Sequence, residues 1–532
     1  MKFLFLPLIS VLIILASCSD NHATVVNVQL DTTITPANAI TDLYTDSLTL
    51  ETYIQSEDLE DSSASLLKNF YKSRNYQYAW FTSKGMAQHT YAFWNLHNHF
   101  LTYSGDSSWH NDKLHQSMDI LLKLDTNQVP SLQMMRETEL LLTDHFFQFA
   151  HYAYRGKIDP EEFKWYIPRK KVNALSLLDS LITHKGKNYD DWAPVNNLYR
   201  LIQNNLLFYY DLRKNNSLPI IGNIEKSLHK GDSAAIIPPI KKYLTAVKDL
   251  TVNDSSKFFN AEWETAVKQY QKRFGLKQDG VIGKDFVRQM NVSLQKRIEQ
   301  MLINLERMRW LPPRPQGTFI VANIPSFKLI ILNDNKKTFE TDIVVGKEGT
   351  NTVIFTDTLK YVVFSPYWNV PASIVRNEIA PAINRNPNYI AQHNMEITGY
   401  NNGLPVVRQK PGGSNALGLV KFIFPNNYNI YFHDTPSKYL FDREKRAFSH
   451  GCIRVRDAEK MANYLLQHQP EWTPEKINAA MHASEEKWVS LKTTIPVFIT
   501  YFTVWVDEDN LLHFRDDIYG HDKKMAEHLF KK

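Results

Sequence analysis

The chain has 532 residues, of which 43% are hydrophobic and 22% are charged, so its composition predicts packed globular domains and argues against a disordered chain. At roughly 150 residues per domain, this length predicts two to four domains. The net charge of +5 is dilute over the chain and no dense block of Lys or Arg occurs, which argues against a nucleic-acid partner.

The N-terminus has the pattern of a targeting segment. Met1 and Lys2 precede an almost unbroken apolar run of 14 residues, which is shorter than the ~20 needed to cross a bilayer and typical of a secretory signal. The run ends in Leu-Ala-Ser-Cys, which resembles a lipobox. We therefore predict a lipoprotein signal peptide over 1–17, with lipid on Cys18 as a membrane anchor. The alternative is a plain secretory signal with a chance cysteine. The polar range 18–58 is predicted to be a flexible tether.

Residues 59–240 are predicted to form a helical domain. Leu, Phe and Ala recur at helical spacing over 140–153, and the glycine at 156 is typical of a helix end. The aromatic side chains of 76–81 are predicted to pack in the core, with sugar contact as the alternative. The histidines between 97 and 115 lack the i, i+4 spacing of a metal pair, so no metal site is predicted.

A second, smaller helical unit is predicted over 241–295. One face of its first helix is apolar, and comprises Trp263, Ala266, Val267, Tyr270 and Phe274. Gly275 is expected to end this helix, and Asp279-Gly280 to form a tight turn. With Gln271, Leu276 and Gly283, these residues resemble the three-helix peptidoglycan-binding module of cell-wall enzymes. From the pattern alone, only a small helical bundle follows.

Short apolar runs predict a mainly β domain over 316–505. The runs begin at Phe319 and Leu329, and further strand patterns follow up to residue 506. Residues 373–408 contain prolines, asparagines and a helical stretch, so we expect an insertion that covers the site as a lid. Residues 506–532 are expected to be a C-terminal tail.

The chemistry is predicted to lie in the segment Ser449-His450-Gly451-Cys452-Ile453-Arg454. Cys452 and Cys18 are the two cysteines of the chain. A thiol attacks well only as thiolate, and its reference pKa of ~8.5 means that it needs a base nearby. His433 ends a predicted strand and can reach Cys452 from a neighbouring one. A histidine at a strand end is commonly structural, as is a buried cysteine, but the six residues together are hard to explain by chance.

This segment, with His433 nineteen residues before the cysteine, resembles the catalytic domain of the L,D-transpeptidases (YkuD type). The resemblance extends to Trp368-Asn-Val-Pro371 and to 409–418. Together with the two helical regions it implies the large YcbB-like branch. The implied fold is a helical scaffold, a small peptidoglycan-binding module, and a mainly β catalytic domain, a β-sandwich with an inserted lid.

The resemblance also implies roles for individual residues. Cys452 is the expected nucleophile and His433 the base, with the backbone carbonyl of Asp434 holding the imidazole tautomer. The N–H groups of Gly451 and Cys452 are expected to form an oxyanion hole. The remaining expected residues shape the pocket and bind substrate, and these are His450, Ser449, Arg454, Asn415 and Asp434.

The function implied is formation of peptidoglycan cross-links between third residues of stem peptides, with loss of D-Ala. No cofactor and no metal is expected. Three alternatives stay open: an L,D-carboxypeptidase that uses water as acceptor, an enzyme that attaches a protein to peptidoglycan, and a wall-binding lipoprotein with a decayed site. The expected location is the periplasm, on a lipid anchor, with the outer membrane favoured because Ser19 follows Cys18.

Overall fold

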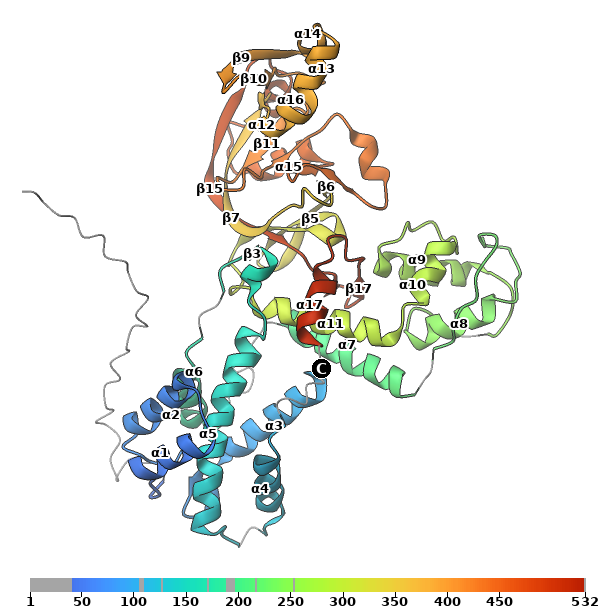
Figure 1. Cartoon of the computed structure of the whole chain (residues 1–532). Helices are drawn as coiled ribbons and strands as arrows, with labels where there is room; N and C mark the ends of the chain where they lie inside the picture. The colour runs from blue at the N-terminus through green and yellow to red at the C-terminus, as the bar shows by residue number, and fades with distance from the viewer. Residues whose placement is uncertain are drawn as a thin grey trace, which may run out of the picture. The chain divides into compact units, whose positions relative to one another are not determined.

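A computed structural model describes residues 41–104, 110–125, 128–169, 172–187, 197–215, 218–251 and 254–530 (Figure 1). The signal peptide and the lipidation site predicted at Cys18 lie outside these residues. The chain divides into two compact units. The first holds the described parts of Met1–Tyr91, Asn111–Phe147 and Leu178–Gly186, and the second holds those of Ala92–His110, Gln148–Leu177 and Lys187–Lys532.

The helices dominate the first half of the chain. They are α1 (Ser47–Ser56), α2 (Asp61–Ser73), α3 (Gln88–Ser104), α4 (Asp112–Lys123), α5 (Leu132–Arg155), η2 (Pro160–Phe163), α6 (Ala174–Thr183), α7 (Asn197–Lys214), α8 (Ile237–Ala246), α9 (Ala261–Phe274), α10 (Lys284–Met290), α11 (Leu294–Arg309), η4 (Ile324–Ser326), α12 (Ala372–Ile374), η5 (Val375–Ile379), α13 (Ala380–Arg385), α14 (Tyr389–Gln392), η6 (Lys438–Asp442), α15 (Ala458–Leu466), α16 (Pro474–Met481) and α17 (His521–Leu529).

The strands concentrate after residue 317. They are β1 (Phe81–Thr82), β2 (Gly85–Met86), β3 (Trp165–Tyr166), β4 (Thr318–Asn323), β5 (Lys328–Asn333), β6 (Lys336–Gly346), β7 (Ile354–Phe364), β8 (Trp368–Asn369), β9 (Met395–Asn401), β10 (Leu404–Gln409), β11 (Val420–Ile423), β12 (Phe432–His433), β13 (Ala447–Ser449), β14 (Ile453–Val455), β15 (Lys487–Thr500), β16 (Val504–Val506) and β17 (Leu512–Phe514). The predicted fold class, helices followed by a mainly β domain, is confirmed.

The first unit is helical and is organised around a buried carboxylate. Glu139 on α5 accepts hydrogen bonds from the backbone N–H groups of Ala79 (2.5 Å) and Trp80 (2.9 Å), and from the hydroxyl of Tyr71 (2.8 Å). The side chains of Trp80 and Phe81 are fully buried, so the aromatic group of 76–81 packs in the core as predicted. These bonds satisfy backbone groups that burial would otherwise leave unpaired.

The range predicted as a flexible tether is wrong at its C-terminal end. Residues 47–56 form helix α1, and its first turn is capped by the Asp46 carboxylate, which accepts a hydrogen bond from Thr49 N at 2.7 Å. Leu50 and Ile54 lie one turn apart on this helix and are buried. Two of the three aliphatic residues of this helix are buried, while Leu48 is exposed, and so short an apolar pattern was too weak to predict a helix from the sequence.

In the second unit, the small helical module is built from α8, α9 and α10. The five apolar residues predicted on one face of α9 are all buried. Gly275 ends the helix with a φ of 67°, a left-handed conformation that favours glycine. Gln271 holds the following turn, because its side chain donates to Asp279 Oδ1 and accepts from Gly280 N, both at 2.9 Å.

The mainly β domain contains a ten-stranded mixed sheet in the order β11-β12-β14-β6-β5-β4-β15-β7-β3, with β13 on β6. The sheet also closes on itself, because β7 pairs with β11 through residues 361–364. Its apolar residues alternate as a half-buried sheet requires, as in the pattern of β5, and Leu329 and Ile331 are fully buried.

The insertion predicted over 373–408 forms a separate small structure. A three-stranded sheet, β8-β10-β9, packs with the short helices α12 to α14, and Figure 1 shows these elements together at one end of the chain's β domain. Four buried side chains form a core of its own, namely Val370, Val375, Ile379 and Val407. The insertion therefore has its own apolar centre and can hold its shape apart from the main sheet.

The C-terminal residues are not a tail, which corrects the prediction for 506–532. Strands β16 and β17 form a hairpin, and α17 packs on α11 with Met525 fully buried. Arg307 of α11 donates to Asp522 Oδ1 at 2.6 Å. Asp522 also accepts from the hydroxyl of Thr503 at 2.6 Å. Among the described residues, no helix is long and apolar enough to span a membrane.

Candidate active site

The sheet brings the predicted histidine and cysteine to neighbouring strands. Strand β12 pairs in parallel with β14, with Phe432 opposite Ile453 and His433 opposite Arg454. Cys452 directly precedes β14. The chain reaches it through a turn in which Gly451 has a φ of 114°, a conformation that a residue with a side chain rarely adopts.

Ser449 braces this turn from within. Its hydroxyl donates to Cys452 O at 2.6 Å and accepts from Gly451 N at 3.1 Å, and its side chain is buried. Thr352 supports the turn from the neighbouring loop, donating its hydroxyl hydrogen to Gly451 O at 2.8 Å. Two corrections follow. Ser449 holds the turn and does not face a substrate pocket, and Gly451 N–H is already bonded, so it is not a free oxyanion donor.

The Cys452 thiol lies half-buried between two strand ends. It donates to Asn429 O, with the sulfur 3.5 Å from that oxygen. Burial raises the pKa of the thiol, while hydrogen bonds from the backbone and the hydroxyl of Tyr431 and the positive charge of Arg454 lower it. The net shift is upward, so the resting group at neutral pH is the thiol, and a base must accept its proton during attack.

His433 is a buried, neutral imidazole. Its Nδ1 lies 2.5 Å from Asp434 O, the carbonyl that the sequence predicted for it. A carbonyl can only accept, so Nδ1 carries the hydrogen and Nε2 is left as an acceptor. Burial, together with the nearby positive charge of Arg454, lowers the pKa of His433 to about 4. The ring is therefore a free base at neutral pH.

Arg454 places a cation near both of these groups. Its guanidinium is half-buried, and its Nε is buried without a hydrogen-bond acceptor among the described residues. Burial lowers the pKa of Arg454, although a guanidinium stays charged at neutral pH. Its positive charge favours a developing thiolate and disfavours an imidazolium, so it acts in opposite directions on Cys452 and His433.

His450 faces the insertion. Its Nε2 lies 3.2 Å from Glu378 Oε1, and both side chains are substantially exposed. Glu378 belongs to η5, so this contact joins the residue two before the thiol to the insertion that the sequence predicted as a lid. In this arrangement the imidazole of His450 is directed to a carboxylate.

Asn415 was predicted to bind substrate, and the structure corrects this. Its side chain is fully buried, its amide donates to Pro366 O and Lys410 O, and its oxygen accepts from Leu417 N at 2.8 Å. The side-chain amide of Asn415 is therefore bonded to backbone groups and holds the loop after β10 in place. The Asp434 carboxylate is similarly engaged, because it accepts from Leu419 N at 3.0 Å and pairs with Lys438 at 2.5 Å.

Three residues beside the thiol were missed by the sequence analysis. Tyr431 lies two residues before His433, so strand alternation puts both on one face, and this signal was present in the sequence. Their rings lie 5.7 Å apart. Asn429 contributes only a carbonyl, at a positive φ of 55° that no local pattern indicated. Glu378 meets His450 from more than seventy residues away, which sequence spacing cannot reveal.

Three ranges of the chain match known protein families, and one of them contains this site. Residues 317–497 match the family of the L,D-transpeptidase catalytic domain, YkuD. Residues 65–206 match the family described as "Scaffold domain", and residues 237–290 the family described as "Putative peptidoglycan binding domain". The range 317–497 that matches the YkuD family contains the thiol turn, His433 and the insertion.

A curated protein of Haemophilus influenzae, named "Putative L,D-transpeptidase", is 31% identical over 242 residues, 43% of this chain and 49% of that protein. The chain thus spans about half the length of this relative. An L,D-transpeptidase structure from Mycobacterium smegmatis covers 35% of this chain and 58% of its own, at 12% identity and a TM-score of 0.20. One from Stackebrandtia nassauensis covers 51% and 94%, at 15% identity and a TM-score of 0.21. TM-scores this low carry no argument of their own.

Proposed function

We propose that the chain is a cysteine-dependent L,D-transpeptidase that joins peptidoglycan stem peptides through an acyl-enzyme on Cys452. One observation carries the proposal: a half-buried thiol stands on a braced turn beside a buried, neutral histidine with its Nδ1 committed to a carbonyl. Such a pair is the arrangement that nucleophilic catalysis by a thiol requires. The matches to the YkuD domain and to the peptidoglycan-binding family support this choice of substrate.

In the first half-reaction, Cys452 Sγ attacks the carbonyl carbon of the third stem residue while its proton passes to His433 Nε2. Collapse of the tetrahedral intermediate breaks the amide bond, and the proton on His433 leaves with the amine of D-Ala. A thioester remains on Cys452. Because the resting thiol and imidazole are both neutral, this pair itself carries no buried charge before the substrate arrives.

In the second half-reaction, the amine of an acceptor stem attacks the thioester. His433 takes a proton from that amine and returns it to the leaving sulfur, so a new amide forms and the thiol is restored. The hydroxyl of Tyr431 is a candidate donor to the oxyanion in both halves, since burial raises its pKa and keeps it protonated. Arg454 can bind a stem carboxylate through its guanidinium.

The test is mass spectrometry of the products formed from a disaccharide-tetrapeptide, with Cys452→Ala beside the unaltered chain. A cross-linked dimer that lacks one D-Ala, and that the variant does not make, is the expected result. If the only product is disaccharide-tripeptide, the proposal is wrong and the chain acts as an L,D-carboxypeptidase. Equal product with both proteins would show that the thiol is not the nucleophile.

A peptidoglycan substrate places the chain in the cell envelope. We further propose, from the sequence of residues 1–18, that Cys18 carries the lipid that anchors it to the outer membrane. Membrane fractionation of cells that express the chain or Cys18→Ala tests this. The proposal expects the unaltered chain in the outer-membrane fraction and the variant in the soluble periplasm, and an unaltered distribution would contradict it.

We also propose that the insertion acts as a lid held in part by the contact between Glu378 and His450. Glu378→Gln is expected to raise the rate at which iodoacetamide alkylates Cys452, by at most about fivefold, because a contact between two exposed side chains contributes less than about 1 kcal/mol.

The matched control is Glu475→Gln, an exposed carboxylate in the first turn of α16, which should leave the alkylation rate unchanged. Equal rates for Glu378→Gln and the unaltered chain would mean that this contact does not restrain access to the thiol.

A further inference from the structure

A cleft of about 320 Å³ lies between the small helical module and the transpeptidase sheet, both within the second unit. One wall is the end of α9, the following loop and α10. The opposite wall is formed by 325–328 at the start of β5, by Asp342 of β6 and by 444–446. The C-terminal residues 515–518 close it. None of the residues that line it belongs to the thiol site.

Basic side chains outnumber acidic ones in this cleft. Seven basic side chains line it, from all three segments, and they are Lys272, Lys277, Arg288, Lys328, Lys445, Arg446 and Arg515. The four acidic ones are Asp285, Asp342, Glu444 and Asp516. Asp342 is shared between Lys328 and Arg446, at 2.9 Å from each. Carboxylates just outside the lining pair with three of the cations, Lys272, Lys277 and Lys328. Among the described residues, the cleft cations without a carboxylate within 4 Å are therefore Lys445 and Arg515, and an anionic ligand would suit these two.

Of the two cations without a carboxylate partner, Arg515 is the more buried. Its guanidinium donates to the backbone carbonyls of Arg273 (2.8 Å) and Phe514 (2.7 Å), and no carboxylate of the described residues pairs with it within 4 Å. It lies against Gly275, where a Cβ would come within 2.6 Å of its side chain. Burial lowers the pKa of Arg515 to about 10, and the positive charge of Arg446 nearby acts in the same direction. An anion in the cleft would relieve this repulsion.

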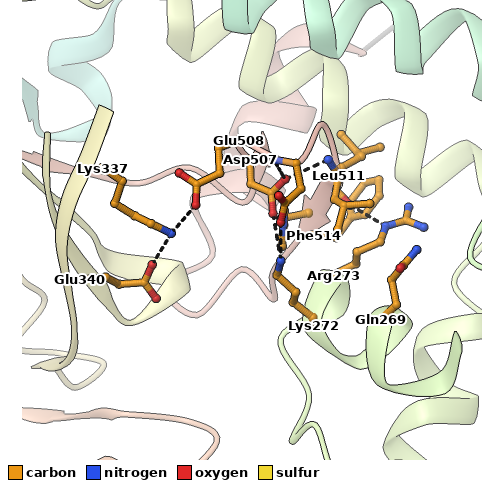
Figure 2. A network of polar contacts seen from close by, with 12 residues as sticks. Gln269, Lys272, Arg273, Lys337, Glu340, Asp507, Glu508, Leu511 and Phe514 are labelled. Atoms are coloured by element: carbon orange, nitrogen blue, oxygen red, sulfur yellow. Dashed lines mark hydrogen bonds and ion pairs between the residues drawn. The ribbon is translucent and has the colours of Figure 1, made fainter. Parts of the chain in front are cut away.

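The walls of the cleft are held in place by a polar network (Figure 2). The turn between β16 and β17 lies between the module and the sheet. Lys337 of β6 pairs with Glu508 at 2.8 Å, and Lys272 of α9 pairs with Asp509 at 3.1 Å. Arg273 Nε donates to Leu512 O at 2.9 Å. This turn therefore contacts both the module and the sheet, through two ion pairs and the hydrogen bond from the buried Arg273.

We propose that this cleft is a second substrate site, which binds a carboxylate-bearing stem peptide of the peptidoglycan strand on which the enzyme works. The proposal rests on the proposed function for the nature of the ligand. Stem peptides carry several carboxylates, and guanidinium and ammonium groups form charge-assisted hydrogen bonds with them. The apolar side chains of Phe274, Leu276 and Phe327 in the lining suit the aliphatic parts of such a peptide. Binding there would retain a strand while the thiol site turns over.

The test measures equilibrium binding of a fluorescently labelled disaccharide-tetrapeptide to the full chain in a Cys452→Ala background, where no turnover occurs. Lys277→Glu with Lys445→Glu reverses two exposed charges of the cleft and should weaken binding about tenfold. A labelled muropeptide with amidated stem carboxylates should bind the parent chain more weakly to a similar extent.

The matched control is Lys257→Glu with Lys360→Glu, which makes the same change of net charge at exposed sites outside the cleft. It should bind like the parent chain. Thermal unfolding of all variants confirms that they remain folded. Equal affinities of the cleft and control variants would overturn the proposal. So would saturable binding of inorganic phosphate by the cleft without binding of the muropeptide.

The two proposals can fail separately. A chain that binds the muropeptide in the cleft but forms no Cys452-dependent product would refute the proposed function and leave the cleft site standing. If the chain cross-links the muropeptide but its cleft variant binds like the control variant, only the cleft site is refuted.

Discussion

Replacement of His433 by Gln is expected to lower the rate of Cys452-dependent turnover by about 10²–10⁴-fold, the usual contribution of a positioned general base. The thiol of Cys452 has a raised pKa and gains little thiolate at neutral pH without a proton acceptor. The Gln amide can still donate toward Asp434 O, so the strand pairing should persist. Product formation from disaccharide-tetrapeptide, followed by mass spectrometry, measures the loss.

The matched control is His450→Gln, which should lose much less activity because His450 faces Glu378 of the insertion. Since the pKa of His433 is about 4, the acid limb of the pH–rate profile of the free enzyme should have its midpoint near that value. Equal losses in the two variants, or a midpoint near 6.5, would mean that His433 is not the base assigned here.

The same histidine links stability to pH. The folded chain holds His433 at a pKa of about 4, below the ~6.5 of an unfolded histidine, so protonation favours the unfolded chain. Its contribution to the free energy of unfolding is present above pH 6.5 and is lost as the pH falls from 6.5 to about 4. Denaturant unfolding between pH 6.5 and 4 should show that the free energy of unfolding falls less for His433→Gln than for the unaltered chain. An identical dependence of the free energy of unfolding on pH in the two proteins would contradict the assignment.

Local pattern was sufficient to predict the parts of the fold that repeat with a short period. The apolar face of α9, its glycine stop and the alternating strands of the sheet all lie within windows of about a dozen residues. The thiol segment was also visible, because six reactive or flexible residues adjoin one another. His433 could be paired with Cys452 because each lies at a strand end.

The features that the sequence did not reveal depend on contacts between distant residues. Asn415 has the polar side chain of a ligand-binding residue, yet its three bonds to backbone groups are formed by the fold of the loop around it. The N–H group of Gly451 was predicted to be an oxyanion donor, but in the folded chain it donates to the hydroxyl of Ser449, two residues earlier. Neither outcome follows from residue type, because both depend on which hydrogen-bond partners the fold places beside the polar group.

The C-terminal segment gives the second large prediction: Asp522→Ala is expected to lower the free energy of unfolding of the second unit by about 3–5 kcal/mol. Asp522 is the carboxylate partner of Arg307, whose side chain is only 1% exposed. Removal of that partner leaves a buried guanidinium without compensation. The variant also frees the hydroxyl of Thr503, which joins this pair to Asn304 of α11 at 2.8 Å.

Denaturant unfolding measures the loss, with Asp509→Ala as the control, because its pair with Lys272 is exposed and should contribute less than about 1 kcal/mol. If burial of an unpaired charge is the cause, Arg307→Met with Asp522→Leu should be more stable than Asp522→Ala alone, since no charge is then left in the apolar contact. A double variant no more stable than Asp522→Ala would assign the loss to packing of α17 on α11. A loss in Asp522→Ala as small as that of the control would mean that the last helix adds little to the domain, as expected of a tail.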